Sequence, residues 1–281
     1  MKEKEPRRFT FEKVKRKGRL KGIVLGFVAF VLIFGTAAGA YLYTKTDFIN
    51  KEKILSFFDK SGERDSLSGV EGKSANILFI SISNNETIET GEKEIYFMVL
   101  AHADTKQGKI KFCPLPVKNS YLQYFEIGGV SEICTALEEE YNIKIDRYVS
   151  SNENTFALAI NYMGGLQYTV SENVTYRTPD LTLILTPGYQ TLKGENLLKY
   201  LKYFKENDLS MQGEIFCKMV ENYLTEKNME NAMQLFKGVM TNLADNTDIS
   251  YVDAADNLDS IEVFVKNAGA NTQTVESVGE L

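Results

Sequence analysis

Apolar residues recur along the chain with two different periods, and these periods predict where strands and helices lie. Short runs of branched and aromatic residues are typical of strands, whereas an apolar residue every three or four positions is typical of a helix. The pattern predicts strands at 76–82, 94–103, 110–115, 147–152 and 166–170, and helices at 131–143 and 155–165. The polar turn at 104–109 joins the second and third strands into a hairpin.

The stretch LTPGYQTLKGENLLKYLKYF at 185–204 combines both patterns. It predicts a short strand, a Pro-Gly turn, a second short strand and a helix that begins near Gly194. One face of that helix is apolar and consists of Leu197, Leu198, Leu201 and Phe204. A turn that leads into a helix N-terminus often holds phosphate, because free backbone N–H groups point outward there. This stretch is therefore the first place to look for a ligand.

The remaining pattern predicts two further helices, at 211–227 and 229–244, and a polar tail at 267–281 that we expect to be disordered. The predicted globular domain spans 75–266. Mixed strands and helices with one strand hairpin indicate an α/β fold, with α+β as the other option. In either case we expect a mixed sheet that is covered by helices.

Residues 22–43 contain no charged side chain and predict a transmembrane helix. A helix of this length spans roughly 33 Å, enough to cross a hydrocarbon core of about 30 Å. A cleaved signal peptide is the alternative, since Ala38-Gly39-Ala40 resembles a cleavage site. The apolar run exceeds the usual signal-peptide core of about 7–15 residues. We therefore favour an uncleaved, single-pass membrane anchor.

Charge is distributed unevenly between the two sides of this segment. Residues 1–21 carry a net charge of +7, and because the whole chain is at −6, residues 22–281 carry −13. Basic residues before a membrane helix favour a cytoplasmic N-terminus. The sequence therefore predicts a cytoplasmic arm at 1–21, a stalk at 44–74 and an extracytoplasmic, acidic domain. We expect no nucleic-acid binding.

The cysteines and the histidine carry little catalytic potential. Cys113, Cys134 and Cys217 lie in apolar contexts, and we interpret them as small buried hydrophobic residues rather than as a disulfide framework. One disulfide with a free thiol is the alternative. The single His102 does not suggest a serine or cysteine nucleophile system, and no spacing typical of zinc ligands is present.

Four fragments, in their order along the chain, resemble the LytR-CpsA-Psr family of cell-envelope proteins. They are NILFISIS at 76–83, DTKQGKIKFCPLP at 104–116, INYMGGLQYTV at 160–170 and the stretch at 185–204. In the last fragment the apolar, glycine, acidic and aromatic positions of the family pattern are kept: Leu185, Gly188, Leu192, Gly194, Glu195, Leu198 and Tyr200. The resemblance covers about half of the chain, from Asn76 to Leu224.

The resemblance implies an activity. Members of this family transfer phosphate-linked glycopolymers from a polyprenyl-pyrophosphate carrier onto peptidoglycan. Arginines hold the pyrophosphate, aspartates hold a magnesium ion, and the lipid lies in an apolar tunnel between sheet and helices. Arginine suits this role because its planar fork binds phosphate oxygens bidentately.

This chain departs from the family at the charged positions. The family's aspartate and the arginine after it become Ser83 and Asn85, and its R-S-D-T run becomes EIYF at 94–97. Its P-R-D-T run becomes PVKN at 116–119, and its paired arginines become Lys202 and Phe204. The downstream D-x-x-R-x-x-R-Q pattern retains only Asp208, which is followed by Met211, Glu214 and Ile215. Beyond the membrane segment only Arg64, Arg147 and Arg177 remain, none of them at these positions.

Lysines are the remaining candidates for a ligand site. Lys118, Lys199 and Lys202 lie in or near the expected mouth, and lysine can bind phosphate as a point charge. We interpret them first as solvated surface residues, with phosphate ligands as the alternative. Asp208 is a candidate catalytic or metal residue, although a helix cap is the simpler interpretation. The sequence predicts no metal site.

Three functional hypotheses follow. The first is a membrane-anchored domain of this family that has lost catalysis and binds a polyprenyl lipid, an envelope glycopolymer or a protein partner. It needs no cofactor. The second is a divergent phosphotransferase that uses Lys118, Lys202 and Asp208, with magnesium as its cofactor. The third, an exported structural or adhesion module, would follow if the strand order differed from that of the family.

Overall fold

The computed structural model describes residues 74–88, 91–104, 106–225, 228, 247–249, 264 and 271–281. The predicted arm at 1–21, the predicted membrane helix at 22–43 and nearly all of the predicted stalk lie outside these residues. So does the helix expected at 229–244. Within the described part of the chain, no helix is both long enough and apolar enough to cross a bilayer.

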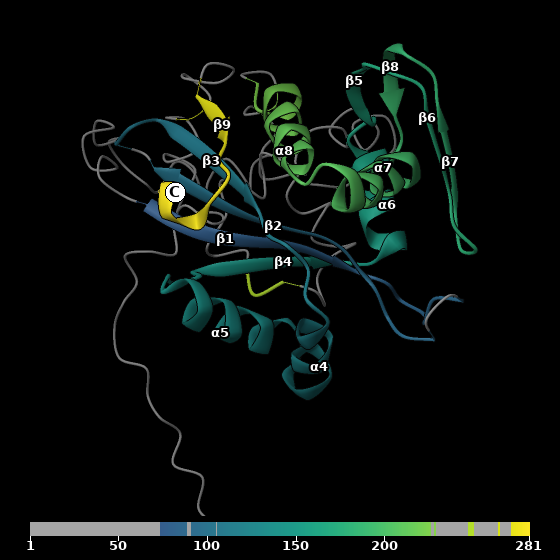
Figure 1. Cartoon of the computed structure of the whole chain (residues 1–281). Coiled ribbons are helices and arrows are strands. Elements are labelled where there is room, and N and C mark those ends of the chain that lie inside the picture. The colour runs from purple at the N-terminus through teal and green to yellow at the C-terminus, as the bar shows by residue number, and fades with distance from the viewer. Residues whose placement is uncertain are drawn as a thin grey trace, which may run out of the picture.

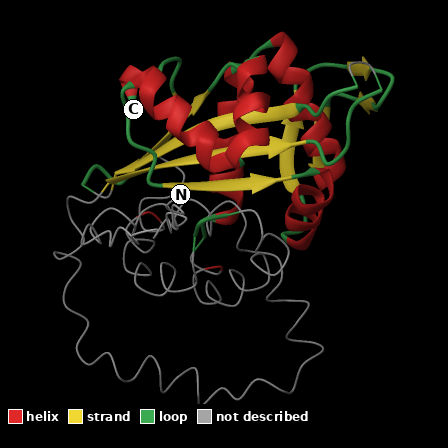
Figure 2. Cartoon of the chain, turned by 90° about the horizontal axis from the view of Figure 1, so that it is seen from below, coloured by secondary structure: helices red, strands yellow, loops and turns green. Residues whose placement is uncertain are grey.

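A five-stranded mixed sheet forms the centre of the molecule, and its strands lie side by side (Figure 2). The order is β4-β1-β2-β3-β9, in which β1 runs antiparallel to β2 and parallel to β4. β3 is antiparallel to β2 and parallel to β9. The strands are β1 (Ser74–Ile82), β2 (Ile95–Asp104), β3 (Lys109–Pro114), β4 (Arg147–Ser151) and β9 (Thr272–Thr274).

Helices cover both faces of this sheet (Figure 1). One face holds α4 (Asn119–Gly128) and α5 (Val130–Tyr141). The other holds α6 (Glu153–Tyr162), α7 (Gly194–Asn207) and α8 (Ser210–Tyr223). Alternate side chains of β1 enter two separate cores, with Phe79 on the α8 side and Leu78 on the α5 side. Burial on both faces explains why the central strands are apolar almost throughout.

A long β-ribbon packs beside α7. It consists of the pair β5 (Leu166–Val170) and β8 (Gly188–Leu192), followed by the pair β6 (Val174–Arg177) and β7 (Thr182–Leu185). In Figure 1 the two pairs follow one another along the outer side of the α7 layer.

The predicted α/β architecture is confirmed in its strand-and-helix order and in its mixed sheet. Gly164 and Gly165, which end the predicted helix range 155–165, follow α6 and both have a φ of 88°, a conformation that glycine adopts readily. Before the C-terminal tail, the sequence pattern did not predict α4 or β6. α4 has only one buried side chain, Tyr121, and β6 has only four residues, so neither produces a strong periodic signal.

The prediction of a disordered tail at 267–281 is wrong for the described residues 271–281. Thr272–Thr274 form β9 against the edge of β3, and Val278–Glu280 form the 3-10 helix η3. Val275 is 3% exposed, and Lys111 Nζ donates to the carbonyl of Glu280. A polar composition misled the prediction, because an edge strand needs backbone pairing more than it needs apolar side chains.

The cysteines agree with their predicted role in two of three cases. All three thiols are free, Cys113 and Cys217 are buried, and Cys134 is half-buried. Burial raises the pKa of Cys113 and Cys217 to about 11, so these thiols are not activated nucleophiles.

Candidate functional site

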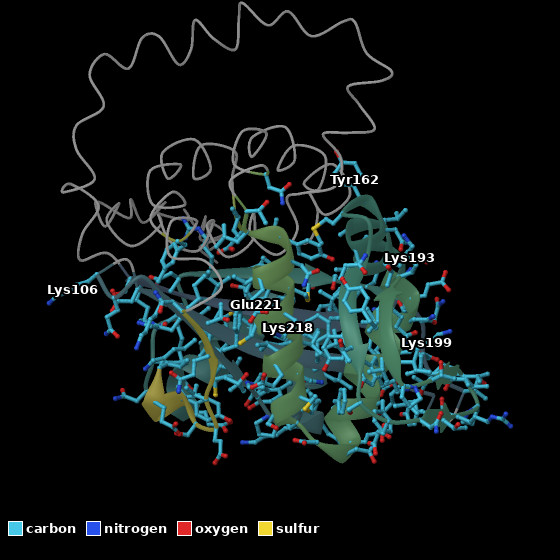
Figure 3. All side chains as sticks on the ribbon, turned by 90° about the horizontal axis from the view of Figure 1, so that it is seen from above. Lys106, Tyr162, Lys193, Lys199, Lys218 and Glu221 are labelled. Atoms are coloured by element: carbon cyan, nitrogen blue, oxygen red, sulfur yellow. The ribbon has the colours of Figure 1, made fainter. Side chains whose placement is uncertain are left out.

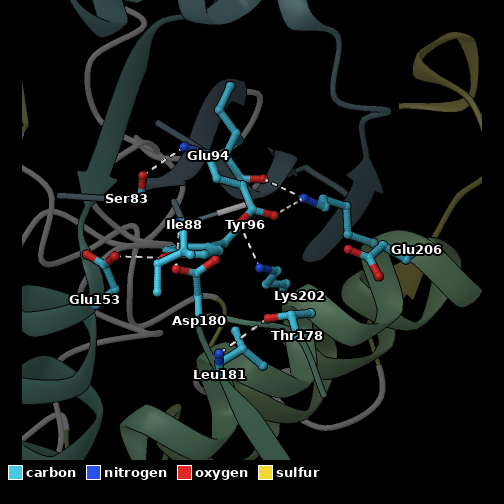
Figure 4. A network of polar contacts seen from close by, with 12 residues as sticks. Ser83, Ile88, Glu94, Tyr96, Glu153, Thr178, Asp180, Leu181, Lys202 and Glu206 are labelled. Atoms are coloured by element: carbon cyan, nitrogen blue, oxygen red, sulfur yellow. Dashed lines mark hydrogen bonds and ion pairs between the residues drawn. The ribbon is translucent and has the colours of Figure 1, made fainter. Parts of the chain in front are cut away.

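A cluster of charged side chains lies where β1 ends, β2 begins and α7 passes by (Figure 4). The Glu94 carboxylate, directly before β2, accepts from Lys202 Nζ at 2.7 Å and from Lys205 Nζ at 2.6 Å. Lys205 Nζ also donates to the Ile95 carbonyl at 3.2 Å. Each carboxylate oxygen therefore has its own ammonium partner.

The helix α7 places both lysines on this cluster because residues three apart share a helix face. Lys202 follows Leu198 by one turn and lies at the border of the apolar face. Its residue is only 4% exposed, so the interpretation of Lys202 as a solvated surface residue is wrong. A buried ammonium requires a partner, and Glu94 supplies the charge that makes this burial tolerable.

Tyr96 links this ion pair to a second carboxylate. Its hydroxyl donates to Glu153 Oε1 at 2.6 Å, and the Lys202 ammonium lies 5.6 Å from the centre of its ring. Asn84 N donates to Glu153 Oε2 at 2.9 Å. Burial, the hydrogen bond to Glu153 and nearby carboxylates raise the pKa of Tyr96 well above its usual range. The phenol is therefore a neutral hydrogen-bond donor.

Two loops hold the cluster in place. Glu94 N donates to Ser83 Oγ and Ser83 N donates to the Glu94 carbonyl, both at 2.7 Å. On the other side, Asp180 in the β6–β7 turn accepts from Ile88 N at 2.9 Å. The ribbon tip thus contacts the β1–β2 loop next to the ion pair.

Four positions at which the resemblance implies charged ligands meet in this one cluster: Ser83, Glu94, Tyr96 and Lys202. The structure therefore brings together four positions that the resemblance singles out, although the side chains there differ from those of the family. Phe204, at the other implied arginine position, packs instead into an aromatic group, with its ring centre 4.4 Å from that of Tyr200.

The other candidate lysines do not join this cluster. Lys118 forms an ion pair with Glu140 of α5 and lies 5.9 Å from the Tyr121 ring centre, on the α4–α5 side of the sheet. That hydrogen bond lowers the pKa of Glu140. Lys199 is half-buried on α7 and lies on the same side of the molecule as Lys193 (Figure 3). Neither lysine pairs with Glu94, so the three candidates form no common phosphate cradle.

Asp208 lies at the junction of α7 and α8. Its Oδ1 accepts from Ser210 Oγ at 2.6 Å and from Ser210 N at 3.2 Å. Asp208 is the C-cap residue of α7, and its side chain stabilises the turn into α8, whose N-cap residue is Leu209.

The described residues do not fit a magnesium site. Magnesium requires oxygen ligands that are free to coordinate it, usually carboxylates. Glu94 is bound to two ammonium groups, and Glu153 is bound to a phenol and a backbone amide. Among the described side chains, no group of three or more His, Cys, Asp or Glu residues converges on a point that could hold a metal ion.

The N-terminus of α7, the first place to look for a ligand, opens into a surface hollow of about 420 Å³. Its lining residues are Asn161, Lys193, Glu195 and Asn196. Asn161 Oδ1 already accepts from Gly194 N at 3.0 Å, and Lys193 Nζ donates to the Gly164 carbonyl at 3.0 Å. The Glu195 carboxylate adds negative charge at this helix end, which disfavours a phosphate.

Sequence reasoning missed two members of the charge cluster. Lys205 could have been found, because it lies on the same helix face as Lys202. Glu153 gave no signal, since it reaches the cluster only through the packing of α6 against the sheet.

Comparison with known proteins supports the resemblance. The model of the LytR_cpsA_psr family matches residues 113–279. The chain is 22% identical, over 83% of its length and 79% of the relative, to the polyisoprenyl-teichoic acid–peptidoglycan teichoic acid transferase TagT of Bacillus subtilis. It is 23% identical, over 84% of its length and 80% of the relative, to the corresponding transferase TagU of Enterococcus faecalis.

Solved structures agree on the fold. The crystal structure of TagV from B. subtilis superposes with a TM-score of 0.56 at 17% identity, over 73% of this chain and 85% of that one. The crystal structure of the protein yvhJ from B. subtilis superposes with a TM-score of 0.52 at 18% identity, over 73% of this chain and 83% of that one. With a family match over more than half of its length, the chain belongs to the LytR-CpsA-Psr family.

Proposed function

We propose that this chain is a membrane-anchored, extracytoplasmic member of its family that acts in the bacterial cell envelope by binding and not by transferring glycopolymer. The observation that carries the proposal is the Glu94 carboxylate between Lys202 and Lys205. A phosphate group at these ammonium groups would have to compete with a carboxylate that is already bound to both of them.

Charge balance supports this view. A diphosphate ligand requires several cationic donors, and charge-assisted hydrogen bonds contribute roughly 1.5–3 kcal/mol each. Here two lysines face one carboxylate, and the adjacent phenol is held by a second carboxylate, Glu153. Of the two arginines in the described part of the chain, Arg147 at the start of β4 donates to the Asp146 carbonyl, and Arg177 is exposed on β6. Neither contributes to the cluster.

Aromatic packing between the sheet and α8 argues against binding of the lipid part of such a donor in this layer. The resemblance implies a lipid tunnel in the layer between sheet and helices. At the centre of this layer the Phe216 ring lies 5.5–5.6 Å, centre to centre, from the rings of Phe79, Phe97 and Phe112. All four side chains are less than 3% exposed. Rings in direct contact leave no space for a polyprenyl chain between them.

A transfer assay tests the proposal. The purified full-length chain is incubated with a polyprenyl-pyrophosphate-linked glycopolymer and peptidoglycan, with and without magnesium. TagT of B. subtilis serves as the positive control. We expect no transfer above the protein-free level, and no donor binding that depends on magnesium. Transfer at a rate comparable to that of the control would overturn the proposal.

The divergent phosphotransferase is the second candidate, and the names of the relatives TagT and TagU favour it. It would rely on Lys118, Lys202 and Asp208. Under this alternative Lys202→Ala abolishes transfer, whereas Lys218→Ala, which removes an exposed ion pair with Glu221, leaves it unchanged. Equal transfer by both variants would refute a catalytic role for Lys202.

A further inference from the structure

The β-ribbon has one buried and one exposed face. The buried face packs against α7, where Tyr168 contacts Tyr200 and Tyr176 contacts Tyr203, with ring centres 5.9 and 5.7 Å apart. The opposite face presents four successive cross-strand pairs, which we call the ribbon strip. They are Gln167–Thr191, Thr169–Tyr189, Thr175–Ile184 and Arg177–Thr182, and all eight residues are exposed.

We propose that the ribbon strip binds a linear glycan of the cell envelope. The inference rests on the proposed binding function and names a partner class and a surface for it. None of the eight strip residues takes part in the ion pairs of Glu94.

Two large side chains distinguish the strip from an ordinary exposed strand surface. Threonine is common on strands and by itself indicates nothing. However, Tyr189 is 74% exposed and Ile184 is 59% exposed. A sugar ring has an apolar face of C–H groups and a rim of hydroxyls, so an exposed aromatic ring beside threonine and glutamine side chains offers complementary contacts.

Charge complementarity favours a glycan that carries anionic substituents. The strip has no carboxylate, and its only charged side chain is Arg177, although residues 22–281 carry a net −13. Two carboxylates lie in the turns that connect the ribbon strands, and neither belongs to the strip. Asp180 accepts a hydrogen bond from Ile88 N, and Glu172 lies in the break between β5 and β6. On this acidic chain, the strip is thus a face that does not repel a polyanion.

The geometry fits a repeating polymer better than a compact ligand. Side chains on one face of a strand recur every second residue, about 6.8 Å apart. Within each of the two strand pairs, neighbouring cross-strand pairs therefore repeat similar polar contacts, and the two strand pairs follow one another along the ribbon. A protein partner would require a larger apolar centre than one tyrosine and one isoleucine provide.

Co-sedimentation with insoluble cell-wall sacculi tests the proposal. The purified full-length chain is compared with the double variant Tyr189→Thr/Arg177→Thr, using sacculi before and after removal of their attached anionic polymers. We expect the double variant to bind at least about tenfold more weakly. Tyr124→Thr/Lys106→Thr removes an exposed tyrosine and a cation from other surfaces, so it serves as the matched control and should bind like the unchanged chain.

The outcomes separate this inference from the proposed function. Equal binding by the double variant and the unchanged chain would overturn the ribbon strip as the site, as would failure of the unchanged chain to bind either preparation. The transfer assay is unaffected by either result, because neither substitution touches the Glu94 cluster. If transfer were detected while the ribbon variant still lost binding, the glycan surface would stand and the non-catalytic proposal would fall.

Discussion

Removing the Glu94 carboxylate is the most direct perturbation of the candidate site. In Glu94→Gln, Lys202 and Lys205 lose their shared counter-ion, and the Lys202 side chain is only 6% exposed. Breaking a buried ion pair by removing one partner costs about 3–5 kcal/mol, because the remaining charge stays buried and unpaired. The Glu94 side chain is 20% exposed, so we take the lower end, about 3 kcal/mol.

Urea denaturation of the full-length chain and of the variant measures this cost. In a domain of roughly 200 residues, about 3 kcal/mol corresponds to a fall in melting temperature of roughly 6–12 °C. Glu140→Gln is the matched control, because it removes the partner of Lys118, whose side chain is 47% exposed. An exposed pair contributes about 0.2–1 kcal/mol.

A double-mutant cycle isolates the pair itself. Lys202→Met removes the buried ammonium, so the variant Glu94→Gln/Lys202→Met should lose at least about 1 kcal/mol less than the two single variants together. If Glu94→Gln costs no more than Glu140→Gln, or if the two single costs simply add, the reasoning from burial and pairing is refuted.

Three further predictions address other parts of the fold. Tyr96→Phe loses the 2.6 Å hydrogen bond to Glu153 and should lower the free energy of unfolding by about 1.5–3 kcal/mol in urea denaturation. Gly194→Ala places a Cβ 2.4 Å from the backbone Cα of Ala157, so it should cost about 1–3 kcal/mol and shift the melting temperature downward. The pKa of Cys113 is about 11 when folded and about 8.5 when unfolded, so between these values only the unfolded thiol is ionised. The contribution of this thiol to stability should therefore be constant well below pH 8.5 and fall above it, by up to about 1.4 kcal/mol per pH unit. Cys113→Ala should reduce the loss of stability between pH 7.5 and pH 9.5 in urea denaturation.

The sequence predicted those parts of the fold that depend on local periodicity. β1, β2 and α7 have strong apolar patterns, and all three were found within a few residues of their bounds. β9 was missed because its order comes from pairing with β3, far away in the sequence, and not from its own polar residues. Non-local pairing leaves no trace in a short window of sequence.

The candidate site shows the same limit. The resemblance located Glu94 and Lys202, but an alignment position does not reveal whether a lysine points into solvent or into the protein. Lys202 is buried because α7 packs against β2, and Lys205 completes its ion pair from the next turn. These features depend on how α7 is rotated, which the apolar face Leu197–Leu201–Phe204 fixes only to within a residue.

Glu94, Lys202 and Lys205 act as one unit. Together they explain how the chain can keep the fold of its family while it differs from the family pattern at the positions where the resemblance implies phosphate ligands. A glutamate at position 94 without Lys202 and Lys205 would leave a half-buried carboxylate unpaired, and the two lysines without Glu94 would place like charges together. Each substitution is tolerable only in the presence of the others. The leucines, glycines and tyrosines that shape α7 and its turn pack independently of this exchange, because they contact the sheet and the ribbon rather than the cluster. Positions at which the resemblance implies phosphate ligands thus hold an internal ion pair within the fold of the family.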